Sequence, residues 1–161
     1  MANIVLTRID NRLIHGQLAT QWCGSNGVTL ILVANDELST NALRQRLMDM
    51  AAPSYVVTCY WSIEKTISAI GQVDEEQVIL LLCREPQDVL RLVEGGVPIS
   101  KVSIGNMHMA EGKRKVANAV AVNDDDVNAF RKLRQLGVEL EIRRVPLEAA
   151  ENIENLFVNL L

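Results

Sequence analysis

Aromatic side chains are scarce in this sequence, with two Phe, two Tyr and two Trp among 161 residues. Proteins that hold single-stranded nucleic acid stack its bases on such side chains. The formal net charge of −4 provides no overall attraction to a phosphate backbone or to an acidic lipid surface. We therefore expect no nucleic-acid partner.

Long hydrophobic runs are also missing. The longest, residues 28–34 and 78–83, have the length of buried strands and are far shorter than the roughly 20 residues that cross a bilayer. The N-terminus has no basic segment followed by the apolar run of a signal peptide. The sequence therefore predicts a cytoplasmic protein without a membrane-spanning helix.

Cysteine and histidine are few, and neither is clustered. Cys23, Cys59 and Cys83 lie far apart, and the two histidines have no metal-ligand spacing with them or with each other. Cys59 and Cys83 follow or end apolar runs, so we expect both in the core. Glycine-rich nucleotide loops and the Gly-x-Ser-x-Gly elbow of acyl transfer are absent as well. We therefore expect no metal site and no cofactor.

Short apolar runs alternate with amphipathic segments along the whole chain. Several runs are apolar throughout, as is typical of strands covered on both faces of a parallel sheet. The pattern predicts an α/β fold: a single domain over residues 1–161, with an open, mostly parallel central sheet covered by helices on both faces. The expected strands are Asn3–Thr7, Thr29–Ala34, Tyr55–Tyr60, Val78–Cys83, Lys101–Ile104 and Val138–Arg143.

Besides a helix that starts near residue 16, four helices are expected between and after these strands. Apolar residues at 42, 43, 47, 50 and 51 mark one face of a helix that ends before Pro53. Pro86 opens a second helix, which Gly95-Gly96 closes. Three aspartates, residues 124–126, start a third; we prefer this to a metal site, because three consecutive carboxylates cannot face one ion. The last runs from Pro146 to Leu161, and its apolar end packs on the sheet or forms an interface.

Three polar segments each follow an expected strand: residues 8–17, 35–37 and 105–108. In open α/β sheets, ligands bind beyond the carboxyl ends of the strands, so these segments predict a site along one edge. The first segment contains His15 at the expected start of a helix. A histidine in such a place, close to arginines, favours a functional residue over a purely structural one.

His15 is the strongest candidate for chemistry. A neutral imidazole is a competent nucleophile near pH 7, and its attack on a phosphoryl group gives a phosphohistidine that can pass the group onward. Arg8 and Arg12 offer planar, paired donors for the phosphoryl oxygens. The backbone N–H groups of Gly16 and Gln17 would add donors from a helix N-terminus.

The other candidates have two interpretations each. Asp10 fixes the imidazole tautomer by accepting its N–H, or it is an ordinary turn residue. An acidic neighbour such as Asp10 or Asp36 would also ease release of the phosphate. His108 belongs to a plain surface loop, or with the basic residues 113–115 it forms a rim on which a partner docks.

The run Arg8-Ile9-Asp10-Asn11-Arg12-Leu13-Ile14-His15-Gly16-Gln17 closely resembles the active loop of the IIB component of the mannose/fructose/sorbose family of the bacterial sugar phosphotransferase system. The similarity continues in order and spacing along nearly the whole chain. The Gly-Asn-Met-His form of residues 105–108 looks more like the N-acetylgalactosamine/galactosamine branch than the mannose or sorbose branch. Further matching segments are residues 32–37, 47–51, 112–114, 137–138 and 145–146.

This resemblance implies a phosphohistidine carrier. A IIA protein would phosphorylate Nδ1 of His15, and the group would pass to a sugar at the membrane components IIC and IID, to which the chain would bind peripherally. By the same match, Arg8 and Arg12 would stabilise the phosphate and Asp10 would shape the loop. The resemblance also implies a largely parallel α/β domain and, as in many members, a homodimer.

Two other classes of function fit the residues less well. A module that binds an anion or a nucleotide reversibly would be expected to have a glycine-rich loop, and none is present. A hydrolase with His15 as general base would need a nucleophile or a metal partner, and the sequence shows neither. The phosphohistidine carrier is therefore the preferred hypothesis.

Overall fold

The computed structural model describes residues 2–152 and has a central seven-stranded sheet with the order β3-β2-β4-β1-β5-β8-β9. Neighbouring strands are parallel, except that β9 runs antiparallel to β8. Parallel neighbours bring several strand ends to one edge of the sheet. The strands are β1 (Ile4–Asp10), β2 (Leu30–Ala34), β3 (Val57–Trp61), β4 (Ile79–Cys83), β5 (Lys101–Asn106), β8 (Glu139–Ile142) and β9 (Glu151–Asn152).

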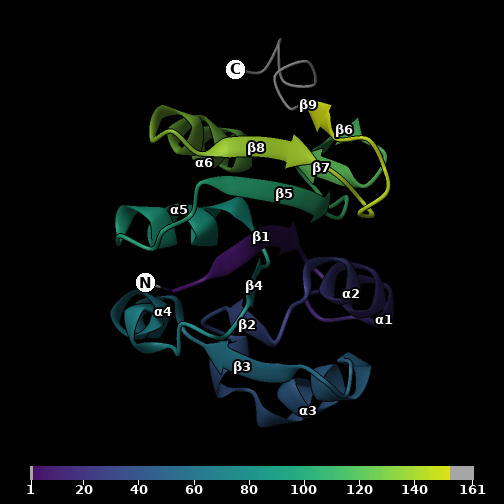
Figure 1. Cartoon of the computed structure of the whole chain (residues 1–161). Helices are drawn as coiled ribbons and strands as arrows, with labels where there is room; N and C mark the ends of the chain where they lie inside the picture. The colour runs from purple at the N-terminus through teal and green to yellow at the C-terminus, as the bar shows by residue number, and fades with distance from the viewer. Residues whose placement is uncertain (1, 153–161) are drawn as a thin grey trace.

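Helices cover both faces of this sheet (Figure 1). On one face lie α4 (Ile63–Ala69), α5 (Pro86–Glu94), α6 (Asp124–Gln135) and the 3-10 turn η3 (Ile70–Gln72). The 3-10 turn η2 (Leu38–Thr40) packs on the opposite face through Leu38. The other face holds α3 (Ala42–Ala51) and a helical segment over residues 16–26, composed of α1 (Gly16–Leu18), the π-helical η1 (Ala19–Cys23) and α2 (Gly24–Asn26).

The alternation of side chains along β4 shows how one strand serves two cores. Ile79 and Leu81 pack into the apolar cluster with α4, α5 and α6, whereas Leu80 and Leu82 pack into the cluster with the 16–26 segment and α3. A strand buried on both faces needs apolar residues at every position, which is the pattern in the sequence. The predicted fold class is confirmed, and all six predicted strands are present.

The predicted helices at Pro86 and at the aspartate triplet are also confirmed. Asn123 caps α6: its side chain accepts from the N–H of Asp126 at 2.8 Å, and the Asp126 carboxylate accepts from the N–H of Asn123 at 3.1 Å. This reciprocal capping box satisfies two N–H groups that the helix itself leaves without partners.

The apolar face that marks α3 in the sequence is largely exposed in the structure. Leu43, Leu47 and Met50 point outward, and Met48 is the residue of this helix that is buried in the core. The predicted helix is confirmed. Because β3 ends the sheet, α3 packs there through Met48 and the partly buried Ala51, and leaves its larger apolar side chains uncovered.

The helix expected from Pro146 is absent from the described part of its range. Residues 145–148 form a turn in which the N–H of Glu148 donates to the carbonyl of Val145 at 3.1 Å, and Glu151–Asn152 pair with β8 as β9. The Glu148 carboxylate accepts from both the backbone N–H and the guanidinium of Arg144, which stabilises the turn in place of a helical one. Residues 153–161 of the predicted helix lie outside the described residues.

An antiparallel hairpin, β6 (Arg114–Ala117) with β7 (Val120–Val122), was not predicted. It packs beside β5, because the N–H of Met107 donates to the carbonyl of Ala119 at 2.8 Å. Of the two cysteines expected in the core, Cys83 is buried and Cys59 is half-buried; Cys23 is buried as well. Across residues 2–152, none of the helices has both the length and the apolar character needed to span a bilayer.

Candidate functional site

The segment after β1 turns back on itself directly at the carboxyl edge of the sheet. Asp10 makes the turn: its Oδ1 accepts from the N–H of Arg12 at 2.9 Å, and its carbonyl accepts from the N–H of Leu13 at 3.0 Å. Leu13 is fully buried and has a φ of 60°, a conformation that leucine rarely adopts. Burial of its side chain holds the strained turn in place and brings His15 back above Asp10.

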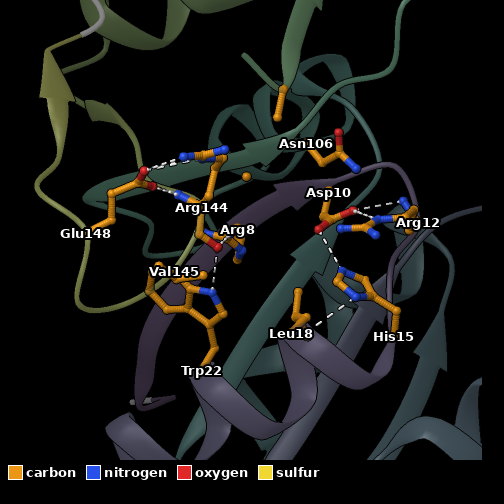
Figure 2. Close-up of a pocket in the computed structure, with 12 residues that line it drawn as sticks. Arg8, Asp10, Arg12, His15, Leu18, Trp22, Asn106, Arg144, Val145 and Glu148 are labelled. Carbon is orange, nitrogen blue, oxygen red and sulfur yellow. Dashed lines mark hydrogen bonds and ion pairs between the residues drawn. The ribbon is translucent and has the colours of Figure 1, made fainter. Parts of the chain in front are cut away.

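The imidazole of His15 is held at both nitrogens. Nε2 lies 3.0 Å from Oδ2 of Asp10, and Nδ1 accepts from the N–H of Leu18 at 3.4 Å (Figure 2). Because a buried, ionised carboxylate can only accept, this contact favours the tautomer with the proton on Nε2. The lone pair of the ring is then on Nδ1. Asp10 therefore makes both contacts that the sequence left open, the turn through Oδ1 and the imidazole through Oδ2.

His15 opens onto a pocket of about 400 Å³. Its ionised lining side chains, apart from the histidine, are three arginines and two carboxylates, so the pocket carries excess positive charge and suits an anionic group. The lining residues are Arg8, Asp10, Arg12, His15, Leu18, Trp22, Gly105, Asn106, Ala119, Arg144, Val145 and Glu148.

Arg8 lies in the floor of this pocket and is only 2% exposed. Its Nη1 donates to Ser103 Oγ at 3.1 Å and to the carbonyl of Arg143 at 2.7 Å, and its Nη2 donates to the carbonyl of Arg144 at 3.0 Å. Burial lowers the pKa of the Arg8 guanidinium to about 10, which leaves it charged at neutral pH. Arg8 therefore contributes positive charge from below while its terminal nitrogens hold the backbone after β8.

Two neighbours fit around the Arg8 guanidinium. Its carbon lies 4.2 Å from the ring centre of Trp22, whose Nε1 donates to the carbonyl of Arg144 at 3.3 Å. Gly105 lies against the same guanidinium so closely that any Cβ at this position would collide with it. A glycine is therefore required at 105 for Arg8 to pack as it does.

Arg12 is the more accessible arginine, with 45% of its side chain exposed. Its Nε lies 3.7 Å from Oδ1 of Asp10, an ion-pair distance that is too long for a hydrogen bond. Gly16 and Gln17 are the first two residues of α1, so their N–H groups have no partner within the helix. Both residues follow His15 directly, and Gly16 is not among the described residues that line the pocket.

The two candidate rim residues lie outside the pocket. Asp36 accepts from the N–H of Ile63 at 2.9 Å and pairs with Arg91 at 2.9 Å; these two contacts lower the pKa of its carboxyl group. His108 is exposed and lies beside Asn106, which does line the pocket. The structure thus groups Arg8, Asp10, Arg12 and His15 and leaves the rim residues at its margin. Asp36 contacts α4 and α5, and His108 belongs to the loop after β5.

Three lining residues, Trp22, Arg144 and Glu148, were not predicted. Trp22 follows His15 by seven residues, two helical turns, and this spacing is the signal that could have placed both on one side of the helical segment. Arg144 follows the carboxyl end of the sixth predicted strand, so the rule that identified the other loops applies to it as well. Glu148 had no such signal, because the segment around it was expected to be helical.

By themselves, the fold and the site indicate a class of protein that receives an anionic group. A parallel α/β sheet presents an oriented imidazole and guanidinium groups at its carboxyl edge, which is an arrangement for receiving an anionic group by nucleophilic attack. Comparison with known proteins gives the particular family. The model of the family described as "PTS system sorbose subfamily IIB component" matches residues 4–160.

Individual relatives agree with this family. The N-acetylgalactosamine-specific phosphotransferase enzyme IIB component 2 of Escherichia coli K12 is 44% identical over 95% of this chain and 98% of its own. The fructose-specific EIIB component of Bacillus subtilis is 36% identical over 99% of this chain and 98% of its own. The crystal structure of the IIBSor domain of the sorbose permease from Klebsiella pneumoniae has a TM-score of 0.91 at 33% identity, covering 99% of this chain and 98% of that one.

The chain belongs to the sorbose subfamily of IIB components of the sugar phosphotransferase system. It is a phosphotransferase: it accepts a phosphoryl group from a IIA protein and passes it to a sugar at the IIC and IID components. The resemblance inferred from the residues around His15 is therefore confirmed at the level of family, fold and activity.

Proposed function

We propose that His15 is the residue that carries the phosphoryl group and that Nδ1 is the atom to which it is attached. The observation that supports this proposal is the 3.0 Å contact between Nε2 and the Asp10 carboxylate, which favours a proton on Nε2 and a lone pair on Nδ1. A nucleophile needs that lone pair unprotonated and facing the incoming group. The weak 3.4 Å contact from the N–H of Leu18 is lost when the group arrives.

In the first transfer, the Nδ1 lone pair forms a bond to phosphorus, and the bond from phosphorus to the donor histidine breaks with its electron pair going to that donor. The His15 ring becomes an imidazolium, and Asp10 stabilises it through the Nε2 proton. In the second transfer, a sugar hydroxyl oxygen forms a bond to phosphorus and its proton passes to water. The phosphorus–Nδ1 bond breaks, and its electron pair returns to the ring.

The arginines act on the charge of the transferring group. Arg12 offers its accessible guanidinium to the phosphoryl oxygens, and Arg8 adds positive charge from the floor of the pocket. The N–H groups of Gly16 and Gln17 supply donors at the start of α1. Asp10 limits the total positive charge, so that the group is not held too tightly to leave. Asp36 and His108 belong to the surrounding surface.

The atom that carries the phosphate can be identified by NMR on protein with ¹⁵N-labelled histidine, phosphorylated through a IIA protein. We expect ³¹P–¹⁵N coupling to Nδ1 of His15, and a proton on its Nε2. Coupling to Nε2 of His15, or to either nitrogen of His108, would contradict the proposal. The two histidines are distinguished by recording the same spectrum on His108→Gln.

We also propose that the transported sugar is N-acetylgalactosamine or galactosamine. Two Escherichia coli relatives named as N-acetylgalactosamine-specific are 44% and 42% identical over 95% and 94% of this chain. A mannose-specific relative is 42% identical over 88% of this chain, so mannose is the relevant competitor. The phosphorylated chain should form sugar phosphate with membranes that contain N-acetylgalactosamine IIC and IID, and not with membranes of a mannose system. The opposite preference would overturn the assignment.

Because the sugar is held by membrane components, we propose that the chain binds them peripherally from the cytoplasm.

We further propose a homodimer formed through α3 and the neighbouring edge strand β3. Leu43, Leu47 and Met50 of α3 are 66%, 59% and 84% exposed, and Val57 of β3 is 57% exposed. A two-fold axis beside this surface would bury its apolar side chains against the same residues of a second copy. Light scattering should give a dimer for the wild type and a monomer for Leu47→Glu; a monomeric wild type would contradict the proposal.

A further inference from the structure

Asp10 lies too far from the Arg12 guanidinium to hold it by a hydrogen bond, so another residue fixes its position. Asn106, at the end of β5, is the residue opposite Asp10 in the pairing of β1 with β5. When the Asn106 amide is oriented so that both its ends are satisfied, its nitrogen donates to the carbonyl of Ala119 at 3.1 Å, and its oxygen accepts from Nε of Arg12 at 3.0 Å. Asn106 therefore holds Arg12 by a hydrogen bond of ordinary length.

His108 contacts the same amide from the other side. Its Nε2 lies 3.1 Å from the Asn106 oxygen that accepts from Arg12. Its main-chain N–H and its Nδ1 lie 2.9 Å and 3.3 Å from the amide oxygen of Asn11, whose amide nitrogen in turn donates to the carbonyl of Asn106 at 3.2 Å. These contacts tie the loop after β5 to the loop that contains His15.

We infer that Asn106 is a positioning residue that aims Arg12 at the phosphoryl group, and that His108 supports Asn106 in this role. The inference rests on the proposed function, in which Arg12 stabilises the group on His15. A guanidinium fixed at Nε keeps its two terminal nitrogens for a ligand, and within residues 2–152 neither of these has a hydrogen-bond partner. No hydrogen bond among the described residues joins Asn106 or His108 to His15, so both residues act through Arg12.

This arrangement reduces the side-chain conformational entropy that Arg12 loses when the phosphoryl group is transferred. A half-exposed arginine has four rotatable side-chain bonds, and fixing them when the phosphoryl group arrives opposes the reaction. The hydrogen bond that Arg12 Nε donates to Asn106 fixes them beforehand, so the terminal donors are already in place as charge develops. The Ala119 carbonyl keeps the amide oxygen, and not its nitrogen, facing Arg12, and His108 donates to the same oxygen when its Nε2 carries the ring proton.

A double-mutant cycle tests the inference by separating positioning from general structure. We would measure the rate of His15 phosphorylation at saturating phospho-IIA, together with the final phosphate per chain, in the wild type, Asn106→Ala, Arg12→Ala and the double variant. Asn128→Ala, an exposed asparagine of α6, is the matched control. His108→Ala adds the supporting residue, and circular dichroism checks that each variant is folded.

We expect Asn106→Ala to slow transfer by about 10- to 100-fold while one phosphate per chain is still reached. The same substitution should have no further effect in the Arg12→Ala background, because Asn106 acts only through that arginine. His108→Ala should slow transfer by about fivefold, since the Ala119 carbonyl still orients the amide. In ¹H–¹⁵N spectra, the Arg12 Nε–H of the unphosphorylated protein should exchange slowly with water in the wild type and rapidly in Asn106→Ala.

Three outcomes would contradict these expectations, and each refutes a different claim. A wild type that takes no phosphate on His15 would refute the proposed function itself. A wild type that is phosphorylated, with Asn106→Ala equally fast, would refute the positioning role alone. If Asn106→Ala slowed transfer equally in the wild type and in the Arg12→Ala background, Asn106 would not act through Arg12. An Arg12 Nε–H that exchanged with water equally slowly in the wild type and in Asn106→Ala would also refute the positioning role.

Discussion

At the scale of single residues, Asp10 connects the turn of the backbone with the chemistry of the ring. Its two carboxylate oxygens have separate partners, Oδ1 the N–H of Arg12 and Oδ2 the Nε2 of His15. An asparagine could keep the first contact but would present its amide N–H₂ to Nε2, which favours the opposite tautomer. The proton would then block Nδ1. The charge that stabilises the phosphorylated ring would also be lost.

We therefore predict that Asp10→Asn slows phosphoryl transfer to His15 by about 10²- to 10⁴-fold, as happens when the carboxylate partner of a catalytic histidine is made an amide. The measurement is the initial rate of phosphate incorporation from phospho-IIA. Asp125→Asn, an exposed position in the first turn of α6, makes the same chemical change away from the site and should transfer normally. A normal rate in Asp10→Asn would remove the carboxylate from the account.

At the scale of elements, the site depends on where strands and helices begin. α6 shows how strongly a start can be specified, because Asn123 and Asp126 form a reciprocal capping box. We predict that Asn123→Ala lowers the free energy of unfolding by about 1 kcal/mol, since it leaves an N–H without its partner. Urea denaturation measures this change. Asn128→Ala, inside the same helix, controls for helix propensity, and an equal midpoint in the two variants would contradict a capping role.

Sequence patterns predicted most of these elements, but not which face of each helix is buried. The strands could be found because β2 and β4 are apolar at every position, which only a sheet covered on both faces requires. The face of α3 could not, because its burial depends on whether the neighbouring strand is internal or at the edge. The helix expected after Pro146 failed because the Arg144–Glu148 pair and the pairing of β9 override local propensity.

The site was predictable to the extent that it lies in one continuous segment. Arg8, Asp10, Arg12 and His15 belong to one loop, and the residue types alone indicate phosphoryl chemistry. Arg144 and Asn106 come from other strands, and their contribution depends on strand order and on the pairing of β1 with β5. The sequence also gave no sign that Arg8 is covered while Arg12 is accessible, since burial is a property of the folded molecule.

At the scale of the whole molecule, one buried carboxylate links stability to pH. Burial, reinforced by the nearby charge of Glu85, raises the pKa of Asp88 from 3.8 to about 6. Between these two values the folded protein binds a proton that the unfolded chain releases. Asp88 therefore makes the free energy of unfolding fall as the pH rises from about 4 to about 6, and its effect is constant outside that range.

We predict that Asp88→Asn removes this part of the pH dependence and stabilises the protein at pH 7 by on the order of 2 kcal/mol relative to the wild type. Urea denaturation of both proteins from pH 4 to pH 7 measures the difference. Because other carboxylates titrate in both proteins, the relevant quantity is the gap between the two curves. A gap that stays constant over this range would contradict the raised pKa.

The central claim for the molecule is that it carries a covalent phosphoryl group on His15. The most direct test is the intact mass after incubation with phosphoenolpyruvate, the general phosphotransferase proteins and a phosphorylated sorbose-family IIA. We predict the added mass of one phosphoryl group, stable in base and lost in acid, and no addition in a folded His15→Ala variant. An unmodified wild type beside verified phospho-IIA, or a phosphate retained in His15→Ala, would contradict the account.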